Sequence, residues 1–90
     1  MKLTDRVRIP QEVLARQVGE ETVMLDLAQG AYYGLDPVGA RMWQLLAGGK
    51  TLAEVCDAIA EEYDAPRAAI ERDLLALADD LMKQGLIAPA

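Results

Sequence analysis

Hydrophobic and polar residues alternate with a period of two in the first part of the chain, which is the period of a β-strand. Residues 12–19 alternate weakly and residues 22–28 alternate cleanly, with apolar side chains at the odd positions 23, 25 and 27. The run AYYGL at residues 31–35 is short, aromatic and free of charge. The pattern therefore predicts three consecutive strands, of which the first is an edge strand.

The turn between the second and third strands sets their register, and Gly30 is suited to its left-handed backbone. A two-residue loop would pair Leu27 with Tyr32. A three-residue loop would pair Leu25 with Tyr33 and place Tyr33 on the apolar, odd-numbered face of the second strand. We favour the three-residue loop because it buries more apolar surface, and a slip of one residue would exchange the two faces.

The hydrophobic period changes to that of a helix after residue 35, and three helices follow. Asp36 is suited to cap the first helix and Pro37 to occupy its first position, while Gly48 and Gly49 end it. The spacing of Thr51 and Glu54 is that of a capping box for the second helix. The expected buried positions are Val38, Met42, Leu45 and Leu46, then Leu52, Val55, Cys56, Ile59 and Tyr63, with Trp43 on a flank.

The third helix begins near Pro66 and ends at Gly85, with Ile70, Leu74, Leu77 and Leu81 facing the core. The predicted order is thus three strands and then three helices. That order indicates an α+β fold with a three-stranded antiparallel sheet. We expect residues 12–88 to form one domain and residues 1–11 to form a flexible N-terminal arm.

Composition excludes several classes of function. The chain has 90 residues, a formal net charge of −6, no histidine and one cysteine, Cys56. Acidic charge disfavours nucleic acid and anionic membranes. The absence of histidine removes the commonest general base and metal ligand, so we expect a protein that is not an enzyme and holds neither metal nor cofactor. A single cysteine that cannot form an internal disulfide is consistent with the cytoplasm.

The third strand is a candidate binding edge, because it contains none of the charges or prolines that usually protect an edge. A peptide could add to it as a further strand. Alternatively, a helix or the N-terminal arm covers it. Next to the core stripe of the third helix lies a small, acidic flank formed by Asp73, Ala76 and Asp80, which is either a binding surface or a solvated helix face.

Several motifs resemble the PqqD-like family, the recognition proteins for leader peptides of ribosomally made, modified peptides. These motifs are Leu25–Asp26, then Gly30–Tyr32–Leu35–Asp36, then Gly39–Trp43, and finally Asp73, Leu81 and Gly85–Leu86. The resemblance covers residues 13 to 87. The segment MLDLAQG replaces the L-x-P-E type of segment that is usual in proteins of pyrroloquinoline quinone (PQQ) synthesis, which argues against a role in that synthesis. The YYGLD hairpin more closely resembles the stand-alone recognition proteins of lasso-peptide clusters, or of a related peptide pathway.

The resemblance implies a winged-helix-like fold and a non-catalytic peptide chaperone. Such a protein binds a precursor's leader on the third strand, beside the third helix, and presents it to a leader peptidase or a radical S-adenosylmethionine enzyme. The candidate peptide-binding residues are Ala31, Tyr32, Tyr33, Gly34, Leu35, Arg72, Asp73, Ala76, Leu77 and Asp80.

Two other classes of function compete with this one. A winged-helix DNA-binding regulator would use the third helix as its recognition helix, but that helix has three basic against four acidic residues. A dimerising domain would pair its open edge with a second copy.

Overall fold

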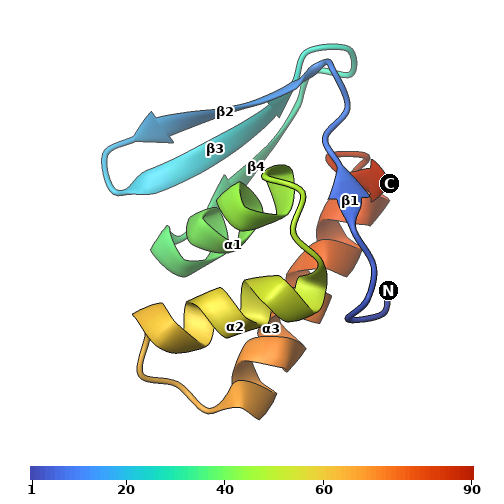
Figure 1. The fold of residues 1–90 in the computed structure, drawn as a ribbon. Helices are drawn as coiled ribbons and strands as arrows, with labels where there is room; N and C mark the ends of the chain where they lie inside the picture. The colour runs from blue at the N-terminus through green and yellow to red at the C-terminus, as the bar shows by residue number, and fades with distance from the viewer.

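The computed structural model describes residues 1–90 and has a three-stranded sheet packed against three helices (Figure 1). This arrangement confirms the predicted α+β class. A two-stranded sheet joins the two ends of the chain and was not predicted. The elements are β1 (Val7–Arg8), β2 (Val13–Val18), β3 (Glu21–Asp26), β4 (Ala31–Leu35), α1 (Pro37–Ala47), α2 (Leu52–Glu62), α3 (Arg67–Lys83) and β5 (Ala88–Pro89).

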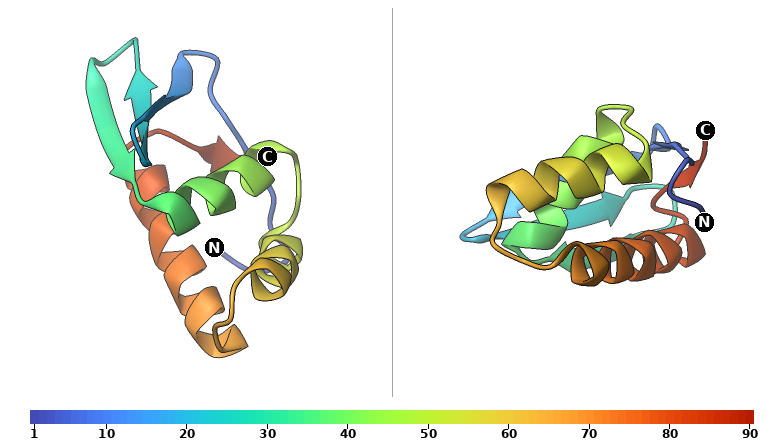
Figure 2. Two further views of the ribbon diagram at one scale, coloured as in Figure 1. Left: turned by 90° about the vertical axis from the view of Figure 1, so that its left-hand side faces the viewer. Right: turned by 60° about the horizontal axis from the view of Figure 1, so that its bottom comes forward.

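The larger sheet is an antiparallel meander in the order β2-β3-β4, so β4 is an edge strand, as predicted. Figure 2 shows β4 at the outside of the sheet, next to α3. Met24 pairs with Tyr33 and Leu25 pairs with Tyr32, which leaves residues 27–30 as the turn. Both registers expected from the sequence are therefore wrong by one or two residues.

The buried face of β3 is also the opposite of the expected one. Met24 and Asp26 are buried, whereas Leu27 is 67% exposed. The Asp26 carboxylate accepts hydrogen bonds from the backbone N–H groups of Ala28 and Gln29, at 3.0 and 3.3 Å. A buried acid is tolerated when such bonds satisfy it, so Asp26 can face inward and stabilise the turn. These two local bonds account for the inward position of Asp26, although Leu27 is left exposed in the turn.

The helix caps agree with the sequence. The Asp36 carboxylate accepts from the Gly39 N–H at 2.7 Å, and Pro37 is in the first turn of α1. Thr51 and Glu54 form both bonds of the capping box of α2. α1 ends at Gly48, and Gly49 has a φ of 91°.

The core lies between the inner face of the sheet and the three helices, and most predicted core positions are buried. Three are wrong: Val38, Tyr63 and Leu77 are only half-buried, and Ala40 and Ala78 take buried positions on α1 and α3. Small residues are buried where helices approach closely, which a count of large apolar residues misses. The buried set is Val7, Val13, Met24, Leu35, Ala40, Met42, Leu45, Leu46, Leu52, Val55, Cys56, Ile59, Ile70, Leu74, Ala78, Leu81, Leu86 and Ile87.

The N-terminal segment lies along the far end of the helices, away from β4. β1 pairs with β5, and the N–H groups that open α2, those of Leu52 and Ala53, donate to the carbonyls of Asp5 and Leu3 at 3.0 and 2.7 Å. The alternative in which this arm covers β4 is wrong, because β1 pairs with β5 (Figure 1). Its flexibility in solution stays a prediction.

Candidate functional site

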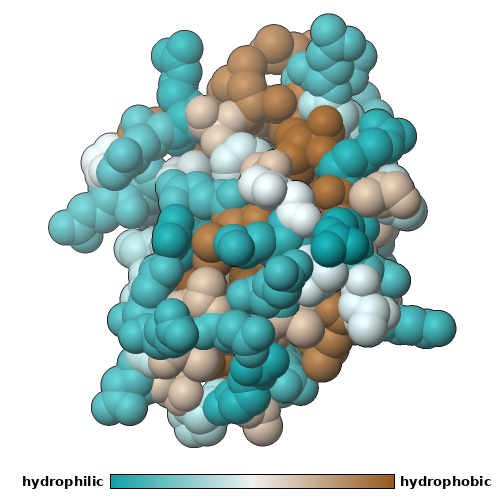
Figure 3. Space-filling model, in the orientation of Figure 1, coloured by the Kyte–Doolittle hydropathy of each residue, from teal (hydrophilic) through white to brown (hydrophobic).

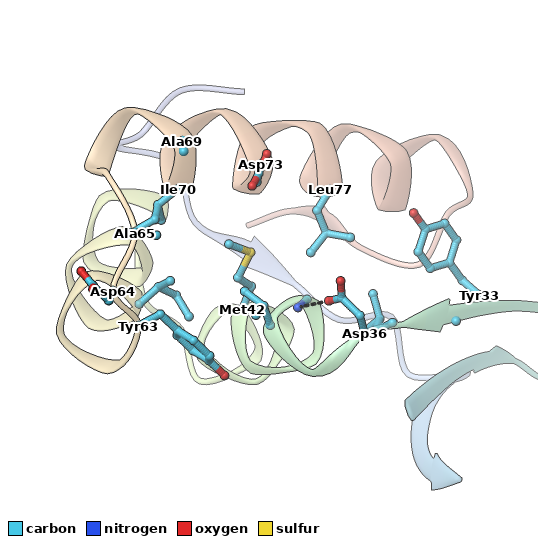
Figure 4. A pocket seen from close by; sticks show the side chains of 15 residues that line it. Tyr33, Asp36, Met42, Tyr63, Asp64, Ala65, Ala69, Ile70, Asp73 and Leu77 are labelled. Carbon is cyan, nitrogen blue, oxygen red and sulfur yellow. Dashed lines mark hydrogen bonds between the residues drawn. The ribbon is translucent and has the colours of Figure 1, made fainter. Parts of the chain in front are cut away.

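A groove of about 570 Å³ runs between β4 and α3, with α1 and the end of α2 as its floor and far wall (Figure 4). Ten of its fifteen lining residues are hydrophobic, so it suits apolar side chains. The lining residues are Tyr33, Gly34, Leu35, Asp36, Val38, Gly39, Met42, Ile59, Tyr63, Asp64, Ala65, Ala69, Ile70, Asp73 and Leu77.

Local structure explains how the groove forms. The Asp36 cap begins α1 directly after β4, so the chain turns from strand to helix at one end of the groove. Leu77 points from α3 into the groove, and Met42 and Tyr63 lie opposite it (Figure 4). Leu77 is half-buried because it faces this groove, which explains why it is not part of the closed core.

The peptide groups of β4 that face away from the sheet can be assigned from the hydrogen-bond pattern. The Leu27 N–H donates to the Glu12 carbonyl at 3.0 Å, which continues the β2–β3 ladder. The odd residues of β3 thus direct their peptide groups at β2, and the even residues direct theirs at β4. In β4 the partners of the even residues are Ala31, Tyr33 and Leu35.

The remaining residues of β4, Tyr32 and Gly34, therefore direct their N–H and C=O groups outward. Both residues are exposed, and neither makes a backbone hydrogen bond outside the regular elements. Because they lie at the rim of the groove, an extended peptide could bond to them while its alternate side chains enter the groove.

Tyr33 and Asp80 connect the two walls at one end of the groove. The Tyr33 hydroxyl donates to the Asp80 carboxylate at 3.5 Å, across from β4 to α3. The pKa of the Tyr33 hydroxyl is raised above its usual value, chiefly by partial burial and then by the negative charge and hydrogen bond of Asp80. This long, exposed contact spans β4 and α3 where the groove ends.

The charged groups that line the groove are all acidic. Asp36, Asp64 and Asp73 contribute carboxylates, and no lysine or arginine lines it. The Asp73 carboxylate oxygen Oδ1 lies 3.7 Å from Nε of Arg72, its neighbour in sequence, and both side chains are exposed. An anionic ligand such as phosphate would be repelled here.

Half of the predicted site residues line the groove: Tyr33, Gly34, Leu35, Asp73 and Leu77. Tyr32 contributes the outward peptide group described above, and Asp80 contacts Tyr33 at the end of the groove. Ala31 starts β4, while Arg72 and Ala76 are exposed on α3 and are not part of the lining.

Sequence reasoning did not identify the floor and far wall of the groove, which come from α1, the end of α2 and the start of α3. A signal for part of them existed. Asp64, Ala65 and Ala69 are small or polar residues where the helical pattern of α2 breaks off and α3 begins. The rest, including Met42 and Ile59, are buried and carry the same pattern as other core residues, and only the tertiary packing places them at the floor of the groove.

Cys56 shows no sign of a catalytic environment. Its side chain is fully buried, and burial raises the pKa of the thiol, so the reactive thiolate is disfavoured. No group of three or more histidine, cysteine, aspartate or glutamate residues is arranged to hold a metal ion. None of the three helices has the length and apolar character of a membrane span.

An open strand edge beside an apolar groove defines the class of domain that can take up an extended peptide by strand addition. Residues 21–87 match the family described as Coenzyme PQQ synthesis protein D (PqqD). The chain belongs to the PqqD family, as the sequence motifs indicated.

Similar proteins are known by sequence and by structure. The PqqA binding protein of Rhodopseudomonas palustris (strain TIE-1) is 36% identical over 55 residues, which is 61% of this chain and 54% of that protein. The matched segment thus spans about half the length of this relative.

Two solved structures share the fold over nearly the whole chain. TbiB1 in complex with the TbiA(beta) leader peptide is 40% identical with a TM-score of 0.81, over 89% of this chain and 93% of that one. Lasso peptide synthetase B1 complexed with its leader peptide is 31% identical with a TM-score of 0.85, over 93% and 99%. Both similar structures are named for complexes with leader peptides.

Proposed function

We propose that this chain binds the leader segment of a ribosomally made precursor peptide as a fourth strand of its sheet, on β4. The observation that carries the proposal is the pair of outward peptide groups at Tyr32 and Gly34, beside an apolar groove. Backbone bonds to this edge supply affinity, and the groove selects among side chains at alternate positions of the peptide.

The similar proteins support this proposal. The relatives are named as a PqqA binding protein, TbiB1 with a leader peptide, and a lasso peptide synthetase B1 with a leader peptide. The DNA-binding alternative has no such support, and its candidate recognition helix α3 is acidic on balance.

We propose that this chain is not an enzyme and that it presents the bound leader to a second protein, which carries out the chemistry. We propose a leader peptidase as that partner, because both similar structures concern leader complexes and one is a lasso peptide synthetase. A radical S-adenosylmethionine enzyme is the other candidate. Incubating the precursor with this chain alone should leave the precursor unchanged.

Proline scanning of the two sheet edges tests the proposed binding edge. Gly34→Pro removes an outward N–H group from β4, and Ala15→Pro removes one from β2, at the opposite edge. Proline is tolerated at such positions because the lost N–H bonds to no neighbouring strand. The probe is a leader peptide that the wild-type protein binds, with affinity measured by titration calorimetry.

We expect Gly34→Pro to abolish binding and Ala15→Pro to leave it unchanged, with both variants melting cooperatively. Amide chemical-shift changes in the labelled wild-type protein should centre on residues 31–35 and α3. Loss of affinity in Ala15→Pro but not in Gly34→Pro, or shifts confined to β2, would refute the proposed edge. Sedimentation without the peptide tests whether β4 pairs with a second copy instead.

A further inference from the structure

Apolar side chains lie in register across the face of the sheet that points away from the helices. Leu14 on β2 pairs with Leu25 on β3, and Leu25 pairs with Tyr32 on β4. Side chains paired in this way stand side by side on one face of an antiparallel sheet. We call Leu14, Leu25 and Tyr32 the outer row.

The outer row becomes more exposed where it reaches the open edge. Leu14 is 37% exposed at the β2 end, Leu25 is half-buried in the middle, and Tyr32 is 77% exposed at the β4 end. Leu25 is the cross-strand neighbour of Tyr32 on β3, and no strand pairs with β4 on its other side. Tyr32 is therefore the exposed end of the outer row.

Gly34 leaves a gap on the same face, next to Tyr32. A Cβ atom added to Gly34 would meet no other atom within 4 Å. Gly34 pairs with Val23, which is half-buried, so the gap exposes backbone beside apolar surface. A large side chain on a neighbouring strand can cover such a glycine.

Figure 3 shows mostly hydrophilic side chains, with hydrophobic surface in several patches, a prominent one of which is at the top of the view. Leu27, in the turn between β3 and β4, is one of the exposed large hydrophobic residues. The exposed large hydrophobic residues are Leu14, Val18, Leu27 and Tyr32, and all four lie on this sheet or in its β3–β4 turn.

We propose that the protein contacts the strand added to β4 on both of that strand's faces. The outer row selects a large apolar side chain on the face that points away from the helices. This inference rests on the proposed function. Tyr32 and Gly34 are the residues whose peptide groups point at the added strand, so the side chains of their peptide neighbours lie on the outer face. An aromatic or β-branched residue there would pack on the Tyr32 ring and cover Gly34.

Contacts on both faces impose a requirement on the peptide sequence that binding in the groove alone does not impose. The groove contacts every second residue of an extended peptide, so its preferences should be two positions apart. Contact with the outer row adds a preference for an apolar residue at the position between two groove-binding residues of the peptide. The substrate class is thus an extended segment with adjacent apolar residues on opposite faces.

Selection from a display library of short random peptides tests this expectation. Peptides enriched on the wild-type protein should show groove preferences two positions apart and a large apolar residue between them. Tyr32→Thr removes the ring but keeps the outward peptide group and a residue type favoured in strands. We expect this variant to lose the intervening preference, to keep the groove preferences, and to bind a wild-type-selected peptide about 2- to 10-fold more weakly.

Two matched variants complete the experiment. Tyr32→Phe keeps the ring and should retain both preference and affinity. Val18→Thr alters an exposed apolar residue of β2 that is not part of the outer row and should leave both unchanged, which separates peptide contact from a general effect on the sheet. Melting curves for all three variants confirm that each is folded.

The outcomes separate this inference from the proposed function. Peptides that map to β4 by amide shifts but show preferences only two positions apart overturn the inference and leave the function standing. Retention of the intervening preference in Tyr32→Thr overturns it as well. Failure of the wild-type protein to enrich any peptide on β4 overturns both.

Discussion

At the scale of single residues, neighbouring tyrosines on β4 have different roles because alternate side chains of a strand point to opposite faces. Tyr33 faces α3 and contacts Asp80, whereas Tyr32 stands on the open face of the sheet. The sequence predicts that the two differ, but only the observed register tells which one faces the groove. The register in turn depends on the buried Asp26, whose bonds to the turn have no hydrophobic signature.

The Tyr33–Asp80 contact gives a prediction for alkaline pH. Burial and Asp80 raise the pKa of Tyr33, so the folded state holds its proton more tightly than the unfolded state. The resulting contribution to stability is complete below the unfolded pKa of about 10 and is lost as the pH rises through the folded value. Asp80→Asn should lower the pH at which Tyr33 ionises, although burial should keep it above the usual value.

Tyrosine resonances followed by nuclear magnetic resonance through an alkaline titration would measure this change. Asp79→Asn is the matched control, because Asp79 is the neighbouring acid and lies 3.8 Å from the terminal amine of Met1 instead. An equal shift of the Tyr33 pKa in both variants would show that general charge, and not the Asp80 contact, is responsible.

Cys56 provides a second prediction at this scale. Its side chain is fully buried and its thiol pKa is raised by that burial, so a thiol reagent should not modify the native protein at neutral pH. Labelling should become rapid only at denaturant concentrations that unfold the chain. Rapid stoichiometric labelling without denaturant would show that α2 opens readily.

At the scale of elements, helix boundaries were predictable because their determinants are local. Asp36 with Pro37, Thr51 with Glu54, and Gly48 with Gly49 mark helix ends through bonds to residues a few positions away. The pairing of β1 with β5 could not be predicted in this way. It joins two-residue segments from opposite ends of the chain, and neither has a recognisable strand pattern.

The capping box of α2 gives a prediction for acidic pH. The hydrogen bond from the Thr51 backbone N–H, followed by the Thr51 side-chain interaction, lowers the pKa of Glu54. Stability from this group is present above its unfolded pKa and is lost as the pH falls through the lower folded value. Glu54→Gln should therefore reduce the acid dependence of unfolding below about pH 4.5.

Thr51→Ala removes the other half of the capping box and should lower the unfolding free energy by about 1 kcal/mol at neutral pH. Urea unfolding at several pH values measures both variants. Glu61→Gln, an exposed acid in the last turn of the same helix, is the control for loss of one negative charge. If Glu61→Gln changes the acid dependence as much as Glu54→Gln does, the effect is one of net charge and not of the cap.

At the scale of the whole molecule, each wall of the groove belongs to a larger part of the fold. β4 belongs to the sheet and α3 to the helical layer, and the two are connected directly at Tyr33 and Asp80. A second connection runs through the chain ends, because β1 leads into β2 and β5 follows α3 (Figures 1 and 2). The paired ends thus help to fix the position of α3 relative to the sheet.

Adjacent residues of β1 allow this role to be tested, since Val7 is buried in the core and Arg8 is exposed. Val7→Ala leaves a cavity under the β1–β5 pair and should lower the unfolding free energy by about 1–3 kcal/mol. Arg8→Ala leaves the pairing intact and should change it by less than about 0.5 kcal/mol. Urea unfolding measures both values.

Hydrogen exchange should also show that Val7→Ala weakens protection at the end of α3, where the Leu86 N–H donates to the Leu81 carbonyl. If the two variants are equally stable, residues 1–11 are the flexible arm that the sequence predicted, and α3 is held beside β4 by the core and the Tyr33–Asp80 contact alone.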